Sequence, residues 1–352
     1  MYFLNENLIN LVRIFDQNER KQFLRLDLNE NPGGLPSSII QKVLNKLSSG
    51  DISQYPETSR FSKILAEYLK TDTDHVCLVN GSAEGIRYII QAFTSEKGKI
   101  VGVTPSYFMF QVYSQMYGRD FIPIPYNQDL TMDIDKIISS LSSDTQMLIL
   151  LNPNNPVGNV YTEAEFERLL KECKEKKITL LIDEAYYYFY PNSFIKYALT
   201  ERRVLVTRTF SKLFSMAGCR LGYVVGHPDD IKYVQKLCTP HNTNILALKL
   251  AEELLTNPEA IRDLIDKYKD GRDYLEKELK KNGYCYHGEA GNFIFVKPKN
   301  NSCLIVEKMK SEKGILIKDY KNVGALGDCL RVTIGEKKFM QIFIEALLDL
   351  DR

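Results

Sequence analysis

Short apolar runs alternate with amphipathic helical patterns from about residue 40 to residue 230. Apolar runs of four to five residues bounded by turn residues are typical of buried strands, and their alternation with helices is typical of an α/β layer structure. The candidate strands cover residues 76–79, 100–103, 121–124, 147–151, 178–182, 204–207 and 222–225. This part of the chain therefore predicts an α/β domain built on seven strands.

Two helices of this region carry clear sequence signals. Thr162 and Glu165 have the spacing of a capping box, which predicts a helix that begins there. Its apolar face is expected to contain Phe166, Leu169, Leu170 and Cys173. A second helix is predicted to begin near Ser82, because apolar residues follow at core spacing, namely Ile86, Ile89, Ile90 and Phe93.

The pattern changes after about residue 240. One helix is predicted from Asn244 to Leu255 and a longer one from Pro258 to Lys281, since proline suits a first helical turn and Gly283 is a plausible stop. Beyond them we expect strands near residues 293–296, 315–317 and 330–334. A final helix should place six apolar residues on one face, namely Phe339, Ile342, Phe343, Ala346, Leu347 and Leu350. These elements predict a small α+β domain. The expected organisation is an N-terminal arm (1–30), a large domain (31–240) and a small domain (241–352).

Composition narrows the class of protein. The 352 residues are 44% hydrophobic and 26% charged, which allows a sizeable core and a soluble protein. A formal net charge of +1 gives no reason to expect nucleic acid or an anionic membrane as a partner. The seven cysteines are scattered without metal-ligand spacing, so we expect reduced thiols and no metal site.

The N-terminal residues do not resemble a signal peptide, because no basic segment precedes a sustained apolar stretch. No run approaches the roughly 18 apolar residues that a membrane span needs. We therefore expect a cytoplasmic protein with no membrane contact.

Lys212 follows the apolar run 204–206 and is surrounded by residues that suit a phosphate. Thr209 and Ser211 precede it with hydroxyls, and the guanidinium of Arg220 follows eight residues later. A lysine amine can form a Schiff base with an aldehyde, whereas hydroxyls and arginine can bind a phosphate. Pyridoxal phosphate (PLP) carries both groups. The stretch thus predicts a PLP site with Lys212 as its catalytic lysine.

Asp183 directly follows the apolar run 178–182 and adds to this prediction. A carboxylate at the carboxyl end of a parallel strand can face a crevice where cofactors bind. Beside the pyridine nitrogen of PLP it would keep that nitrogen protonated, so that the ring accepts electrons; a helix cap is the alternative reading. Asn155, in the turn 152–158, and Tyr186 could both donate to the phenolic oxygen of the ring.

The order of these motifs resembles the fold-type I PLP-dependent enzymes, specifically the class I and II aminotransferases of the histidinol-phosphate aminotransferase branch. The motifs are NPNNPVG (152–158), DEAY (183–186), SK (211–212) and AGCRLG (217–222), supported by LNENP, YP, NGSAEG, PSY and LRVTIG elsewhere. The resemblance extends from about Leu28 to the C-terminal helix. It implies a large domain with a mostly parallel seven-stranded sheet, a small α+β domain, and a homodimer with active sites at the subunit interface.

The resemblance also implies further cofactor contacts. The backbone amides of Gly81, Ser82 and Ala83 would bind the PLP phosphate at a helix N-terminus, where free N–H groups and the helix dipole favour an anion. Tyr107 would stack on the ring, and Tyr55 would reach the phosphate from the other subunit. A core or rim tyrosine is the alternative for Tyr107, and a packed turn residue is the alternative for Tyr55.

Arg331 is the candidate for binding the anionic end of the substrate. It lies in the strand 330–334 on the face opposite the apolar residues, and its planar fork suits a carboxylate or phosphate. The alternative is an exposed strand arginine. Asn29 is expected to close over the substrate together with Asn155, and His241 and Asn242 are candidates to reach the neighbouring active site.

The chain departs from the family pattern at several positions. Ala83 stands where an aspartate or asparagine is common, residues 108–110 replace Gly-Met-Tyr, and Val157 replaces a threonine. The Leu-x-Pro-Tyr element that supplies a tyrosine to the substrate phosphate is not found before Leu28. Basic residues could replace that contact or could simply be solvated, namely Arg13, Arg20, Lys21 and Arg25.

The sequence thus predicts an aminotransferase that passes an amino group from a donor, expected to be glutamate, to PLP and then to a small phosphorylated keto acceptor. Decarboxylation of an amino-acid phosphate is the alternative, since a sister branch shares all the PLP contacts. A PLP-binding transcription regulator would need an added DNA-binding domain. A dinucleotide-dependent dehydrogenase would need G-x-G-x-x-G after the first strand, and neither feature is found in the sequence.

Overall fold

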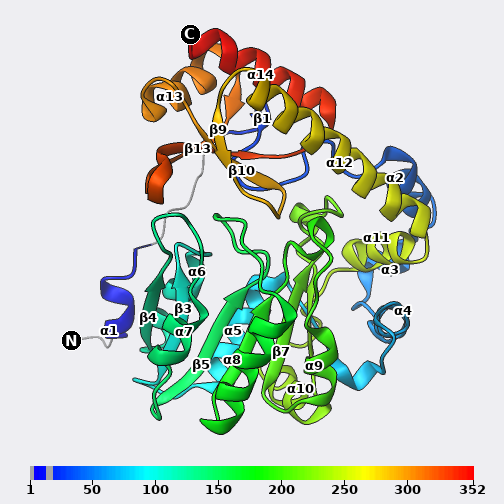
Figure 1. The fold of residues 1–352 in the computed structure, drawn as a ribbon. Coiled ribbons are helices and arrows are strands. Elements are labelled where there is room, and N and C mark those ends of the chain that lie inside the picture. Colours follow the sequence, from blue (N-terminus) through cyan, green and yellow to red (C-terminus); the bar gives the residue numbers. More distant parts are fainter. Residues whose placement is uncertain (1–3, 13–18) are drawn as a thin grey trace.

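A seven-stranded sheet forms the lower part of the molecule in Figure 1, in the order β2-β8-β7-β6-β5-β3-β4. The computed structural model describes residues 4–12 and 19–352. β8 is antiparallel to β2 and β7, and the remaining pairs are parallel. The prediction of a mostly parallel seven-stranded sheet is therefore confirmed. Its strands are β2 Val76–Val79, β3 Lys99–Thr104, β4 Asp120–Pro125, β5 Thr145–Leu151, β6 Thr179–Asp183, β7 Val204–Thr209 and β8 Gly222–Gly226.

Both faces of this sheet are buried, which explains why its strands are continuous apolar runs. Leu148 and Leu150 of β5 face one core cluster, whereas Met147, Ile149 and Leu151 face the other. The first cluster is completed by α4 Ser59–Leu69, α7 Ile134–Ser140, α8 Glu163–Glu175 and α9 Ile195–Thr200. The second is completed by α5 Ser82–Phe93, α6 Met109–Met116 and α10 Pro228–Gln235. The predicted helices at Ser82 and after Thr162 are among them, and the capping box of Thr162 and Glu165 is formed.

A second unit lies above the sheet in Figure 1. Its antiparallel sheet has the order β12-β13-β10-β9, and β1 pairs in parallel with β11 beside it. The strands are β1 Leu24–Arg25, β9 Cys285–His287, β10 Phe293–Lys297, β11 Ile315–Leu316, β12 Lys318–Val323 and β13 Gly327–Thr333. The third core cluster of the molecule lies in this unit and includes residues of α13 Ser302–Lys313 and α14 Lys337–Leu350. The α+β prediction for this region is confirmed, but β9 and β12 were not foreseen, because their polar residues lack the alternation of a half-buried strand.

The helices after residue 240 connect the two units. α11 Ile245–Leu255 packs against α2 Ser37–Leu44 and α4, and its buried residues belong to the first core cluster. α12 Pro258–Lys281 contributes Ile261 and Leu264 to that cluster and Leu275 and Leu279 to the third. One continuous helix thus bridges both cores. The proposed boundaries near residues 30 and 240 stay predictions.

The shorter elements complete the described chain. They are the helices α1 Glu6–Ile9 and α3 Ser49–Ser53 and the 3-10 turns η1 Thr73–His75, η2 Tyr187–Phe189, η3 Ala217–Cys219 and η4 Gly324–Leu326. Within residues 4–12 and 19–352, no helix is both long and apolar enough to cross a membrane.

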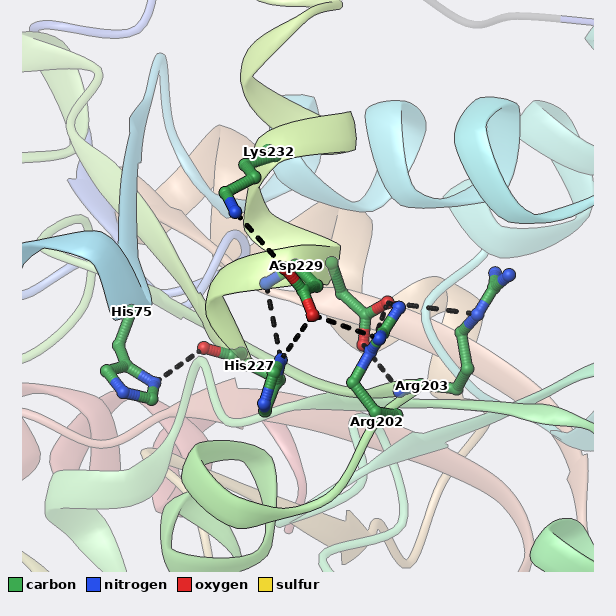
Figure 2. Close-up of polar contacts among 8 residues, drawn as sticks. His75, Arg202, Arg203, His227, Asp229 and Lys232 are labelled. Atoms are coloured by element: carbon green, nitrogen blue, oxygen red, sulfur yellow. Dashed lines mark hydrogen bonds and ion pairs between the residues drawn. The ribbon is translucent and has the colours of Figure 1, made fainter.

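An ion-pair cluster joins the residues just before β7 to the start of α10 (Figure 2). The fully buried carboxylate of Asp230 in α10 accepts from the backbone N–H of Arg203 at 2.6 Å and from the side chain of Arg202 at 3.1 Å. His227 caps α10 by accepting from the Asp229 backbone N–H at 3.2 Å. These contacts fix the start of α10 against the sheet.

Candidate active site

A cavity of about 480 Å³ lies at the carboxyl ends of β5, β6 and β7. This is the edge of an α/β sheet at which ligands ordinarily bind. The turns that follow several strands line this cavity, together with the residues after β1. The lining includes Ser82, Ala83, Tyr107, Asn155, Asp183, Tyr186, Thr209, Ser211, Lys212 and Arg220, all of them predicted site residues.

Lys212 lies in the turn after β7 and is half-buried. Its Nζ donates to the backbone carbonyl of Leu28 at 3.0 Å and lies 5.7 Å from the centre of the Tyr186 ring. Burial, together with the positive charge of Arg331, lowers the pKa of Lys212 to about 8. About a tenth of this amine is therefore neutral at pH 7, far more than for an ordinary lysine, and a nucleophilic lysine requires the neutral form.

Asp183 is the last residue of β6 and only 2% exposed. Its Oδ1 accepts from the hydroxyl of Thr207 at 2.9 Å and from the backbone N–H of Ala185 at 3.2 Å. Burial raises the pKa of Asp183 to about 7. A cationic group in the cavity would stabilise the carboxylate form, so the site suits a protonated ring nitrogen.

The start of α5 and the turn after β7 form a site suited to a phosphate. Gly81 precedes α5 with φ +84°, and a Cβ there would lie 2.5 Å from Nη2 of Arg220, so only glycine allows this approach. Arg220 Nη1 donates to Ser211 Oγ at 3.3 Å, and Thr209 Oγ1 donates to the same oxygen at 2.9 Å. Guanidinium, hydroxyls and the free N–H groups of a helix N-terminus thus converge, as a dianion requires.

Asn29, Tyr186 and Asn155 form a hydrogen-bonded group beside the lysine. Asn29 Nδ2 donates to the Tyr186 hydroxyl at 2.9 Å and to Asn155 Oδ1 at 3.4 Å. Burial raises the pKa of Tyr186 to about 12, so its phenol stays protonated and can donate. The backbone of Asn29 is held by Thr333, whose hydroxyl accepts from it at 3.0 Å.

Arg331 in β13 joins this group from the small unit. It is 4% exposed, and its Nη1 donates to Asn155 Oδ1 at 2.9 Å and to the Tyr320 hydroxyl at 3.3 Å. Nη2 donates to the backbone carbonyl of Asp27. Among the described residues, its buried Nε has no hydrogen-bond partner. The exposed-strand alternative for Arg331 is therefore wrong.

Lys318 was not foreseen as a site residue. It lies opposite Arg331 in the β12–β13 register, and burial together with the charge of Arg331 lowers its pKa. Two cations thus lie side by side next to the Asn29 group. A lysine in a polar stretch gave no signal in the sequence, since only the strand register brings Lys318 to Arg331.

Tyr107 and Tyr55 lie in different surroundings. Tyr107 lines the cavity, with its ring edge-on to Phe110 at 5.5 Å between centroids. Tyr55 is 78% exposed and stacks on His241 at 4.3 Å, outside the lining of this cavity. Asn242 donates to the Leu78 carbonyl of its own chain at 3.1 Å.

Two basic residues of the N-terminal arm are already engaged in ion pairs. Arg20 pairs with Asp27, and Arg25 pairs with Glu30 at the mouth of the cavity. Lys21 is exposed, and Arg13 lies outside the described residues. Of the three described candidates for an additional anion contact, Arg25 is the one that lines the cavity.

Comparison with known proteins agrees with this site. Residues 21–347 match the family described as aminotransferase class I and II. A histidinol-phosphate aminotransferase of Caldanaerobacter subterraneus subsp. tengcongensis is 29% identical over 330 residues, covering 93% of this chain and 92% of the relative. One of Syntrophus aciditrophicus is 32% identical over 340 residues, covering 94% and 93%.

A solved structure gives the same result for the fold. Histidinol-phosphate aminotransferase from Sinorhizobium meliloti, in complex with pyridoxal-5'-phosphate, superimposes with a TM-score of 0.85 at 21% identity, covering 93% of this chain and 90% of that one. With the family match over residues 21–347, the chain belongs to the class I and II aminotransferases and is a PLP-dependent transaminase.

Proposed function

We propose that this enzyme transfers an amino group from glutamate to a small keto acceptor that carries a phosphate, such as the keto precursor of histidinol phosphate. The observation that supports the phosphate is a pair of cations: the buried Arg331, whose charge acts on Lys212, and the half-buried Lys318, which lies opposite Arg331 in the β12–β13 register. Relatives that share about 30% identity over most of their length are named histidinol-phosphate aminotransferases.

The residues present fit PLP. The glycine-limited approach of Arg220 to Gly81 suits the phosphate, and the buried Asp183 carboxyl suits the ring nitrogen. Ser82, Ala83, Thr209 and Ser211 would bind the phosphate, Tyr107 would stack on the ring, Asn155 and Tyr186 would donate to the phenolic oxygen, and Lys212 would bind the aldehyde. When bound, PLP supplies an aldehyde that takes up the amino group and a ring that accepts electrons.

The residues of the chain have separate roles in the reaction. Asp183 holds the proton on the ring nitrogen, because the carboxylate is stabilised only beside a cation. Lys212, with a pKa of about 8, takes the proton from the substrate α-carbon. Arg331 binds the anionic end of the substrate, and Lys318 adds a second charge there. Asn29, bonded to Tyr186, closes over the substrate.

We also propose a homodimer that acts in the cytoplasm in amino-acid biosynthesis. Tyr55 and neighbouring apolar side chains are exposed on α2, α3 and the following loop, namely Ile40, Leu44 and Ile52. A second subunit would cover this surface, and Tyr55 could then reach the partner's cofactor phosphate. Gel filtration with light scattering checks the assembly, and a monomer at micromolar concentration would contradict it.

The test is the visible absorbance of the purified enzyme with PLP, before and after glutamate. The band of the bound cofactor should be lost with glutamate and return with the phosphorylated acceptor. An acceptor without phosphate should need about 10- to 100-fold higher concentration, because the buried Arg331 and the half-buried Lys318 lose their anion. Lys212→Ala should show no conversion, whereas Lys171→Ala, at a side chain 75% exposed, should behave as wild type.

Two results would contradict the proposal. Equal use of phosphorylated and unphosphorylated acceptors would remove the phosphate from the substrate. Release of carbon dioxide from an amino-acid phosphate, with no effect of glutamate on the band, would favour the decarboxylase alternative.

A further inference from the structure

Two cysteine sulfurs are in contact far from each other in the sequence. Cys77 lies in β2, and Cys238 follows α10 in the turn that leads toward α11. Their Sγ atoms are 3.5 Å apart, across a sequence separation of 161 residues. A disulfide bond is about 2.0 Å long, so a combined movement of about 1.5 Å would join them.

The elements that carry the two sulfurs are held side by side. The start of α10 is fixed by the His227 cap and the Asp230 cluster (Figure 2). His75, just before β2, contacts the carbonyl of Gly226 through Nδ1 at 3.0 Å. Past Cys238, Asn242 donates to the carbonyl of Leu78, next to Cys77, at 3.1 Å. Fixed contacts therefore lie before and after each of the two cysteines along the chain, and they keep the two thiols next to each other.

The two thiols differ in access and in chemistry. Cys77 is 4% exposed, whereas Cys238 is half-buried and can be reached from solvent. A hydrogen bond from the Cys77 thiol lowers the pKa of Cys238, and the same bond raises the pKa of Cys77. Because the thiolate is the reactive form, Cys238 is suited to attack an oxidant, with Cys77 as the resolving thiol.

We propose that Cys77 and Cys238 are a redox-active pair that forms a reversible intramolecular disulfide on reaction with a hydroperoxide. Cys238 attacks the terminal peroxide oxygen as the O–O bond breaks, which gives the sulfenic acid and, for hydrogen peroxide, one water. The Cys77 thiol then attacks Cys238 Sγ, the S–S bond forms, and the sulfenic oxygen leaves as a second water. The two thiols are oxidised and the peroxide is reduced. A thiol reductant reverses the reaction.

The disulfide would restrain the connection between the two units of the fold. β2 is the edge strand that leads into Gly81 and α5, and Cys238 begins the segment that leads into α11. A covalent bond between them closes a long loop in the unfolded chain, which stabilises the folded state. The oxidised enzyme is therefore expected to unfold several degrees above the reduced enzyme.

The test treats the reduced holoenzyme with hydrogen peroxide, followed by alkylation under denaturing conditions and peptide mass mapping. The seven cysteines should all be alkylated before oxidation. After oxidation, we expect a linked peptide pair containing Cys77 and Cys238, cleaved by dithiothreitol, and a higher unfolding temperature. Cys238→Ser, at the half-buried position, and Cys77→Ala should abolish both changes. Cys303→Ser, at an exposed cysteine, is the matched control and should retain them.

Two outcomes would overturn the redox-active pair, and a third would overturn the restraint that the disulfide is expected to impose. One is that Cys285 and Cys303 oxidise while Cys77 and Cys238 remain free thiols, which the later alkylation modifies. Another is that the linked pair forms only after the protein is unfolded. The third is that the pair forms in the folded enzyme but leaves the unfolding temperature unchanged, which would remove the restraint from the proposal.

Discussion

Two consecutive carboxyl groups at the end of β6 lie in surroundings of opposite kind. Glu184 is 1% exposed and fully paired: Arg208 donates to it at 2.7 and 2.9 Å, Ser193 at 2.9 Å, and the backbone N–H of Phe194 at 2.7 Å. Asp183 is 2% exposed and, within the described chain, accepts from two neutral donors without an ion pair. The charge of Glu184 is thus compensated by a cation of the protein, whereas a charge on Asp183 is not.

The difference separates a structural charge from a binding charge. A buried carboxylate is costly unless a cation and hydrogen bonds compensate it, and Arg208 supplies that compensation for Glu184. Asp183 lacks it until a positively charged ligand group enters the cavity. The protein alone stabilises the first charge, whereas the cofactor is expected to stabilise the second.

Breaking the ion pair of Arg208 with Glu184 should have the largest effect on stability. Arg208→Met leaves Glu184 buried without its cation, and we expect a loss of about 3–5 kcal/mol in the free energy of unfolding. Urea unfolding of the variant measures this. The double variant Glu184→Gln/Arg208→Met should recover part of the loss, because no uncompensated charge remains. A loss below about 1 kcal/mol would mean that the pair is not needed.

The same kind of change at Asp183 should have the opposite effect on the cofactor-free protein. Its pKa is raised from 3.8 to about 7, so the folded state holds a proton that the unfolded state has lost, and wild-type stability falls as pH rises between these values. Asp183→Asn removes this loss, and we expect it to be more stable than wild type at pH 8 by about 1–3 kcal/mol.

Activity should move the other way in that variant, with a loss of about 100-fold or more, since the ring nitrogen loses its charge partner. Thermal unfolding without PLP at pH 4 and pH 8, together with transamination assays, tests both halves. The two proteins should differ less at pH 4. If Asp183→Asn were less stable than wild type at pH 8, or nearly as active as wild type, the proposed difference between the two carboxyl groups would be contradicted.

The smallest expected effect concerns Lys212, whose pKa depends on the positive charge of Arg331. Capture of PLP by the cofactor-free protein needs the neutral amine, so its rate should rise by about tenfold per pH unit below pH 8 and then level off. Arg331→Met removes the charge, raises the pKa of Lys212 and slows capture at pH 7. Arg60→Met, at a side chain 78% exposed, is the control, and an identical shift in both variants would contradict the coupling.

Much of this arrangement could be predicted from the sequence, because the large sheet is buried on both faces and its strands are therefore plain apolar runs. Asp183, Asn155 and Lys212 were identifiable, since each follows such a run. The pairing of Glu184 with Arg208 was not, because it depends on β6 and β7 being neighbours with a particular register. Lys318 was missed for the same reason, in a strand whose polar sequence resembles a loop.

The proposed role of Arg331 has one further consequence for substrate selection. Its Nη1 and Nη2 already donate to an amide oxygen, a phenol and a carbonyl, and among the described residues only its Nε is left without a partner. If Arg331 binds the substrate as proposed, binding at Nη1 and Nη2 is an exchange of acceptors, in which the incoming group must outcompete three neutral oxygens of the protein itself. A phosphate or carboxylate does so because its hydrogen bonds are charge-assisted, whereas a hydroxyl or amide gains nothing. With Arg331 in the proposed role, discrimination against uncharged molecules would arise from this competition with the protein's own acceptors and would not require a tightly shaped pocket.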